Sequence, residues 1–151
     1  MKKKRDGMQV SATRLETVLR VRQMQVKKTE KELAQIARTK EQEQGELDRL
    51  HERKEDAMSD VIRTAKARAR EVVTKRAFVD TLSGNIKHQE RKIHEIGQAE
   101  DAKRSQLLEQ SKSERMVEKL DAKLREEEEK RIEKRTQRVI DALAQRSKAE
   151  G

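Results

Sequence analysis

The sequence of 151 residues has no cysteine, proline, tryptophan or tyrosine, and Phe78 is its only aromatic residue. Without cysteine there can be no disulfide and no thiolate metal site, which fits a reducing cytoplasm. No apolar run approaches the roughly 20 residues that a transmembrane helix needs. The basic start, Met1 to Arg5, lacks the apolar segment of a secretory signal peptide. We therefore expect a cytoplasmic protein without a transmembrane segment.

The sequence also has too few apolar residues for a compact core. Only 32% of its residues are apolar and 44% are charged, whereas globular domains have about 45–50% apolar residues. Two states fit this composition: disorder, with folding on a partner, or an extended coiled coil that buries only a narrow seam. The absence of proline and the abundance of Ala, Leu, Glu, Lys, Arg and Gln favour the coiled coil, since these are strong helix formers.

No spacing in the sequence is typical of a catalytic or metal site. His88 and His94 are six residues apart, so they point in different directions on a helix. The run Glu126–Glu129 encircles a helix and lacks the loop of a calcium-binding EF-hand. There is no glycine-rich phosphate loop, and two helices alone do not enclose a pocket. We expect no enzymatic activity, cofactor or metal, and a function in protein binding.

The net charge of +9 is concentrated in two segments. Residues 1–6 contribute +3, from four basic residues and one acidic residue, and residues 63–76 contribute +5, from six and one. These segments are either solvated surface or a docking patch for an acidic partner. A nucleic-acid-binding protein usually adds aromatic stacking platforms or a continuous basic stripe. Neither is present, so no nucleic-acid partner is expected.

Apolar residues repeat with the heptad spacing of a coiled coil in both halves of the sequence. Seam lysines and glutamates such as Lys40 and Glu43 either fix the register or the choice of partner, or extend from a partly buried seam into solvent. The second stripe becomes sparse around residues 100–110. The predicted seam of the first half comprises Leu15, Leu19, Val26, Thr29, Leu33, Ile36, Lys40, Glu43, Leu47, Leu50, Lys54, Ala57 and Val61, followed loosely by Val72 and Val73. The predicted seam of the second half comprises Leu82, Ile86, Ile93, Ile96, Leu107, Val117, Leu120 and Leu124, and weakly Ile132, Val139 and Leu143.

The strongest interruption of the helical pattern is Ser83-Gly84-Asn85, near the midpoint of the chain. We therefore predict an all-α fold, a long two-helix antiparallel coiled-coil hairpin with arms of about 90 Å. Its parts are a flexible basic N-terminus (1–11), a first helix (12–74), a turn within 75–85, a second helix (86–146) and a flexible C-terminus (147–151).

Two alternatives to this turn stay open. Gly84 could lie inside the second helix at a cost of about 1 kcal/mol, with the turn near residues 74–77. Single helices could instead pair as a parallel dimer. Phe78, near the predicted tip, either closes the end of the seam or forms an exposed apolar anchor, because aromatic residues are enriched in binding hot spots.

Several segments resemble the FliJ family of flagellar type III export proteins. Arg14–Arg22 and Glu30–Ala34 are similar to the start of that family, and Phe78–Ile86 is similar to the stretch that opens its second helix. Val117–Leu120 resembles its leucine-flanked Glu-Lys pair, and Ile140–Ala144 resembles its tail. The resemblance covers almost the whole chain in the same order.

This resemblance implies a non-enzymatic stalk, similar to the central shaft of rotary ATPases, in flagellum biogenesis, chemotaxis and motility. Such a stalk binds the hexameric export ATPase, promotes its assembly and activity, and links it to the export gate and to export chaperones at the cytoplasmic face of the inner membrane. Alternatives are the equivalent stalk of a virulence type III secretion system, a generic coiled-coil adaptor, or a nucleic-acid-binding protein. The resemblance implies gate contacts through Phe78, Leu82, Asn85 and Gln89, and ATPase contacts through Leu15, Leu19, Arg22, Leu120, Leu124 and Asp141.

Overall fold

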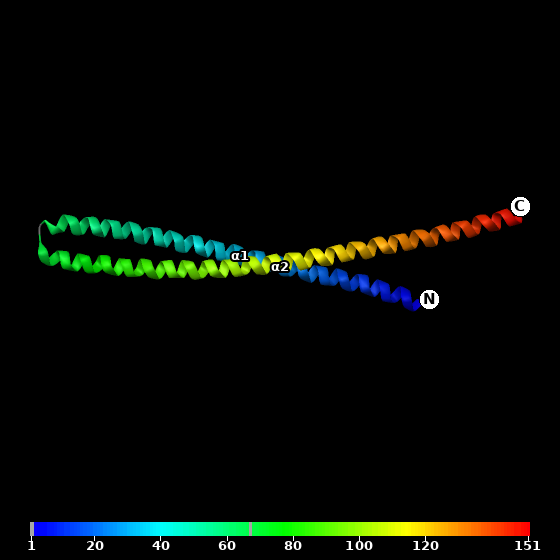
Figure 1. The fold of residues 1–151 in the computed structure, drawn as a ribbon, viewed down its shortest axis with the longest axis horizontal. Coiled ribbons are helices and arrows are strands. Elements are labelled where there is room, and N and C mark those ends of the chain that lie inside the picture. The colour runs from blue at the N-terminus through cyan, green and yellow to red at the C-terminus, as the bar shows by residue number, and fades with distance from the viewer. Residues whose placement is uncertain (1, 67) are drawn as a thin grey trace. The chain divides into compact units, whose positions relative to one another are not determined.

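The computed structural model describes the backbone of residues 2–66 and 68–151 and the side chains of residues 14–66 and 68–151. Two helices, α1 (Lys2–Ala65) and α2 (Ala69–Glu150), include all of this backbone except residues 66, 68 and 151. The chain divides into a hairpin unit, Lys28–Leu107, and a terminal unit made of Met1–Lys27 and Leu108–Gly151. In the hairpin unit α1 and α2 run side by side in opposite directions (Figure 1). The predicted all-α antiparallel hairpin is confirmed.

The connection between the helices lies at residues 66–68, so the predicted turn within 75–85 was wrong, as was the alternative near 74–77. Gly84 lies inside α2, and no glycine among the described residues has a positive φ. The helix bounds also differ from the prediction. Residues 2–11 and 147–150, which were expected to be flexible ends, belong to α1 and α2.

The position of the connection follows from the packing of the seam. Leu47 and Leu50 of α1 form a buried cluster with Leu82 and Ile86 of α2. Residue 66 is midway between Leu50 and Leu82, so these pairs can face each other only if the chain turns there. A turn at Gly84 would place Leu82 and Ile86 in or beside the turn and expose them to water. Burying each of these side chains contributes about 1.5–3 kcal/mol, which exceeds the cost of about 1 kcal/mol for a helical glycine.

Polar contacts between the helices hold the connection. The backbone N–H of Arg68 donates to the carbonyl oxygen of Thr64 at 3.1 Å. Lys75 Nζ donates to Thr64 Oγ1 at 2.8 Å and lies 2.7 Å from a carboxylate oxygen of Asp60. Thus a lysine from the second turn of α2 binds two side chains in the last turns of α1.

The predicted seam of α1 is confirmed from Leu15 to Val61, because every predicted position in this range is buried or half-buried. Of the two positions that loosely followed it, Val72 is half-buried, but Val73 is 70% exposed and its assignment to the seam was wrong. In α2 the heptad spacing continues beyond Ile96 without a break, but polar residues occupy several of its positions. Glu100 and Asp121 are buried, and Lys103 and Gln110 are half-buried. The interval that looked sparse in apolar residues is therefore a polar continuation of the same seam.

The seam of α2 ends at Glu128, and all residues from 129 to 151 are exposed. Ile132, Val139 and Leu143 are 54–59% exposed, so the predicted resumption of the seam at these positions was wrong. Leu120 is also exposed, at 49%.

No stretch of either described helix is long and apolar enough to cross a membrane.

Candidate protein-binding surfaces

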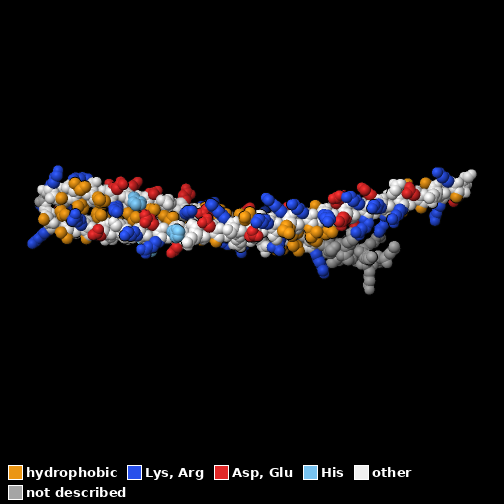
Figure 2. Space-filling model, viewed as in Figure 1, with side chains coloured by type: hydrophobic (Ala, Val, Ile, Leu, Met, Phe, Trp, Pro, Cys, Tyr) orange, Lys and Arg blue, Asp and Glu red, His pale blue; other side chains and the backbone are white. Residues whose placement is uncertain are grey.

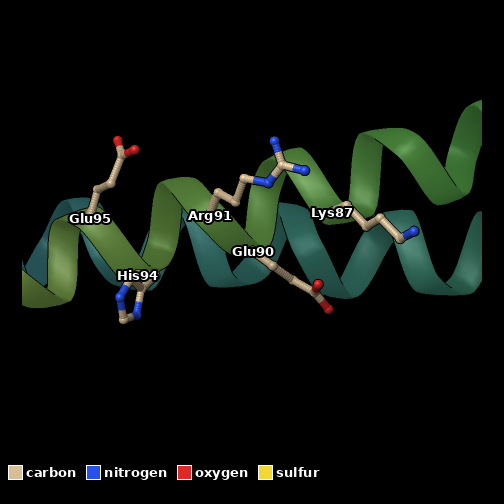
Figure 3. Close-up of a pocket in the computed structure, with 5 residues that line it drawn as sticks. All are labelled: Lys87, Glu90, Arg91, His94 and Glu95. Atoms are coloured by element: carbon tan, nitrogen blue, oxygen red, sulfur yellow. The ribbon is translucent and has the colours of Figure 1, made fainter.

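The described part of the chain has no group of three or more His, Asp or Glu side chains placed to hold a metal ion. One shallow depression is lined by Lys87, Glu90, Arg91, His94 and Glu95, all from α2. Figure 3 shows these side chains spreading away from one another around the helix rather than converging on a common point. The depression is open surface of one helix, and the features that can carry function are the surfaces that the helices present.

A polar contact layer in the hairpin unit is centred on Glu43. Gln89 Nε2 donates to Glu43 Oε2 at 2.6 Å and to the Glu43 carbonyl oxygen at 2.9 Å. Lys92 Nζ donates to Glu43 Oε1 at 2.7 Å. The hydrogen bond from Lys92, followed by that from Gln89, lowers the pKa of the Glu43 carboxyl below its ordinary value. Glu43 is therefore held as a carboxylate within the seam.

A second layer is centred on Glu100, whose side chain is 7% exposed. Lys40 Nζ donates to it at 2.7 Å from across the seam, and Arg104 donates at 2.5 Å from the next turn of α2. The hydrogen bond from Lys40 is the main cause that lowers the pKa of Glu100. Further along, Lys103 Nζ donates to Glu32 at 2.6 Å.

These two layers decide between the alternatives for Lys40 and Glu43. Each makes a specific bond to the other helix, and a shift of one heptad would separate both sets of partners. The lysines of these pairs are partly exposed, at 43% for Lys40 and 48% for Lys92, so solvent weakens the ion pairs and their main effect is on which residues face each other. Lys40 and Glu43 therefore fix the register of the hairpin.

The four residues to which the resemblance assigned the gate contact do not share one outward surface. Leu82 is 2% exposed and Gln89 is 7% exposed, and both pack between the helices. Phe78 is 47% exposed, and Asn85 is also exposed. Phe78 follows the start of α2 by nine residues, so it does not close the end of the seam. Only Phe78 and Asn85, two turns apart on one flank of α2, are open to a partner.

The residues to which the resemblance assigned the ATPase contact also differ in burial, and only some of them are exposed. Leu15, Leu19, Arg22 and Leu124 are half-buried along the seam of the terminal unit. Leu120 and Asp141 are exposed, and Asp141 accepts a hydrogen bond from Gln137 at 2.8 Å.

An apolar surface that the sequence reading missed surrounds Leu120 in the terminal unit. Val18 directly precedes the seam residue Leu19, and Leu120 directly precedes the buried Asp121. In an antiparallel pair of helices, residues that directly precede a seam residue lie on the same flank of the seam, whichever helix they belong to. Val21 and Met116 lie one turn away on that flank. We call Val18, Val21, Met116 and Leu120, which are 45–72% exposed, the terminal apolar surface.

Figure 2 shows hydrophobic side chains gathered at two places on the visible face. One is over the terminal unit, where α1 and α2 carry the terminal apolar surface. The other is the end of the hairpin unit beside the 66–68 connection. A sequence signal for the first was available, because two apolar residues flank the seam position Leu19 at Val18 and Val21.

The model of the flagellar FliJ protein family matches residues 11–150 of the chain. The match therefore includes nearly all of α1 and α2 and every surface described above. No curated protein and no solved structure matches the chain.

Proposed function

The chain belongs to the flagellar FliJ protein family, whose role is related to flagellar protein export, and from this we propose that it acts as a non-enzymatic stalk. In this proposal the stalk binds the hexameric export ATPase, promotes its assembly and activity, and connects it to the export gate and to export chaperones. It works in the cytoplasm, at the cytoplasmic face of the inner membrane, and resembles the central shaft of a rotary ATPase.

The observation that carries the proposal is the terminal apolar surface on a helix pair that is otherwise covered with charge. Its four side chains are exposed although apolar residues are scarce in this chain. Covering half-exposed side chains of this size contributes about 1–2 kcal/mol each. The exposed ion pairs elsewhere on the helices, such as Lys130–Glu126, are screened by solvent and add little affinity. The terminal apolar surface is thus the main source of affinity for the ATPase.

The exposed end of α2 adds to this contact. Residues 129–150 have no buried side chain, and Ile132, Val139 and Leu143 are spaced so that they share one helix face. Such a face can pack against the inner surface of a ring. Asp141 lies in the same segment and keeps its place among the ATPase contacts that we propose.

For the export gate we propose a smaller surface than the resemblance implies. Phe78 and Asn85 are exposed and are retained, and Phe78 is the aromatic anchor. Leu82 and Gln89 are left out, because they bind α1 and could reach a partner only if the helices separated. Their role is to hold the helix on which Phe78 lies.

The experiment that tests the ATPase proposal measures ATP hydrolysis by the purified export ATPase of the same organism, with and without this chain. The test variant is Val18→Ser/Leu120→Ser, which removes apolar area without disturbing the seam. We expect the wild type to stimulate hydrolysis and the variant, which loses two contacts of about 1–2 kcal/mol each, to need at least about 30-fold more protein for the same effect. The matched control is Met58→Ser, at a side chain of similar exposure (47%) in the hairpin unit, and it should behave as the wild type.

Two results would contradict the proposal. If the wild type neither changes the hydrolysis rate nor co-elutes with the ATPase at moderate salt, the stalk function is wrong. If it stimulates hydrolysis but Val18→Ser/Leu120→Ser does so equally well, the ATPase binds elsewhere and the terminal apolar surface has another role.

A further inference from the structure

The end of the hairpin unit beside the connection presents two large aliphatic side chains to solvent. Ile62 is 65% exposed and Val73 is 70% exposed. Ile62 lies three residues before the end of α1 and Val73 four residues after the start of α2. Both are therefore within about 6 Å of the end of the helix pair, measured along the axis. Each directly follows a half-buried valine of the seam, Val61 or Val72, so both lie on the same flank.

Basic side chains lie on both flanks of this end of the hairpin, because Arg63 precedes the buried Thr64 and Arg76 follows the half-buried Lys75. Arg63, Lys66, Arg70 and Arg76 are exposed, and none of the four forms a salt bridge in the described part of the chain. The other two basic residues of this segment are already bound. Arg68 pairs with Glu71 at 3.0 Å, and Lys75 pairs with Asp60 at 2.7 Å. Arg63 also helps to lower the pKa of Asp60, after the stronger effect of Lys75, so this end of the hairpin has three cations without an acidic neighbour of this kind and a fourth that is partly balanced.

We propose that this end of the hairpin docks on the surface of an anionic lipid bilayer. Ile62 and Val73 enter the headgroup region, and Arg63, Lys66, Arg70 and Arg76 bind lipid phosphates. Each basic residue near an anionic membrane surface strengthens binding about fivefold. Long basic side chains suit this position, because their stems cover apolar surface while their charged ends reach the phosphates.

The shape and chemistry of this end favour a bilayer over a macromolecular partner. Ile62 and Val73 are 65% and 70% exposed, so they project into solvent rather than lining a groove. A protein would need a preformed groove of matching shape to cover them, whereas fluid lipid closes around them. A nucleic acid gains little from exposed aliphatic side chains, and single-strand binding usually relies on aromatic stacking. This chain has no exposed aromatic residue except Phe78, which lies on the opposite flank of the seam.

This inference is independent of the proposed ATPase and gate contacts, because it uses neither the terminal apolar surface nor Phe78. It also gives a role to the basic segment 63–76, which those contacts leave without one.

The first test measures binding of the full chain to vesicles of phosphatidylcholine, with and without phosphatidylglycerol, by co-sedimentation. We expect binding only when phosphatidylglycerol is present, with a steep loss as salt rises. Lys66→Gln/Arg70→Gln should bind on the order of 20-fold more weakly, and Ile62→Ser/Val73→Ser about tenfold more weakly. The matched controls, Arg138→Gln/Arg146→Gln and Val139→Ser/Ile140→Ser in the exposed end of α2, should bind as the wild type does.

A second measurement reports how deeply residue 73 enters the bilayer. Because the sequence has no tryptophan or tyrosine, Val73→Trp introduces a fluorophore without background. Its emission should shift to shorter wavelength with vesicles that contain phosphatidylglycerol, and Val139→Trp should show no shift. Circular dichroism checks that each variant stays helical.

The proposal is overturned if the wild type does not bind vesicles that contain phosphatidylglycerol, the result expected if the true partner is an acidic protein. Equal binding to vesicles of phosphatidylcholine alone, equal weakening by the control variants, or equal shifts of the two tryptophans would also overturn it.

Discussion

Replacement of Leu82 by alanine tests most clearly whether the helices pair in the observed register or in the one predicted from sequence. Leu82 is 2% exposed and packs with Leu47, Leu50 and Ile86. Leu→Ala substitutions in cores destabilise by about 2–5 kcal/mol, with smaller values where neighbours can close the cavity. A seam of two helices can close more readily than a globular core, so we expect a loss of about 2–3 kcal/mol. With a turn at residues 75–85, Leu82 would lie in the turn and its loss would have little effect.

The assay is urea denaturation followed by circular dichroism at 222 nm, and the matched control is Phe78→Ala. Phe78 lies one turn from Leu82 on the same helix but is 47% exposed, so its replacement should lower the free energy of unfolding by less than about 1 kcal/mol. The register described here is refuted if Leu82→Ala lowers that free energy by less than about 1 kcal/mol, or by no more than Phe78→Ala.

Three further outcomes are expected. The pKa values of Glu43 and Glu100 are lowered in the fold, so their contribution to stability is complete above their ordinary pKa of 4.5 and is lost as pH falls through the lowered values. Thermal melts should therefore show a smaller loss on acidification for Glu43→Gln than for the wild type, and equal losses would contradict this. Removal of residues 129–151 should leave the urea midpoint unchanged while weakening binding to the ATPase, and a large drop in the midpoint would show that this segment packs on α1. Phe78→Ala should abolish binding to the cytoplasmic domain of the export gate but keep stimulation of the ATPase, and retained gate binding would exclude Phe78 as the anchor.

The seam of α1 could be predicted from sequence because its heptad spacing is unbroken. Apolar residues such as leucine and valine occupy enough of the seam positions from Leu19 to Val61 that polar seam residues such as Lys40 could be identified from the heptad spacing. The same counting failed in α2 beyond Ile96, where polar side chains occupy the seam. Their partners lie on the other helix, as Lys40 does for Glu100, so these positions are recognisable only once the register is known.

The turn was misplaced because a local preference was weighed without the packing that opposes it. Gly84 favours a turn, but the seam formed by Leu82 and Ile86 requires a helix on both sides of it. The connection at 66–68 has no glycine or proline to mark it. It is recognisable only as the midpoint between the apolar seam residues that pack together, Leu50 with Leu82 and Leu47 with Ile86.

The candidate surfaces were predicted in part. Leu82 had been assigned both to the seam and to a partner contact, and the sequence alone already showed that conflict. Gln89 is buried because it bonds to Glu43 on the other helix, and that pairing depends on the register. By contrast, Val18 and Val21 flank a seam leucine, so the terminal apolar surface could have been found by listing apolar residues outside the seam.

The stoichiometry of the complex between this chain and the export ATPase tests the proposed stalk most directly. Native mass spectrometry of the complex, assembled in the presence of nucleotide, gives the number of chains per ring. A shaft at the centre of the ring predicts one chain per ATPase hexamer, even when this chain is in excess. One chain on every ATPase subunit, or no complex at all, would contradict the account.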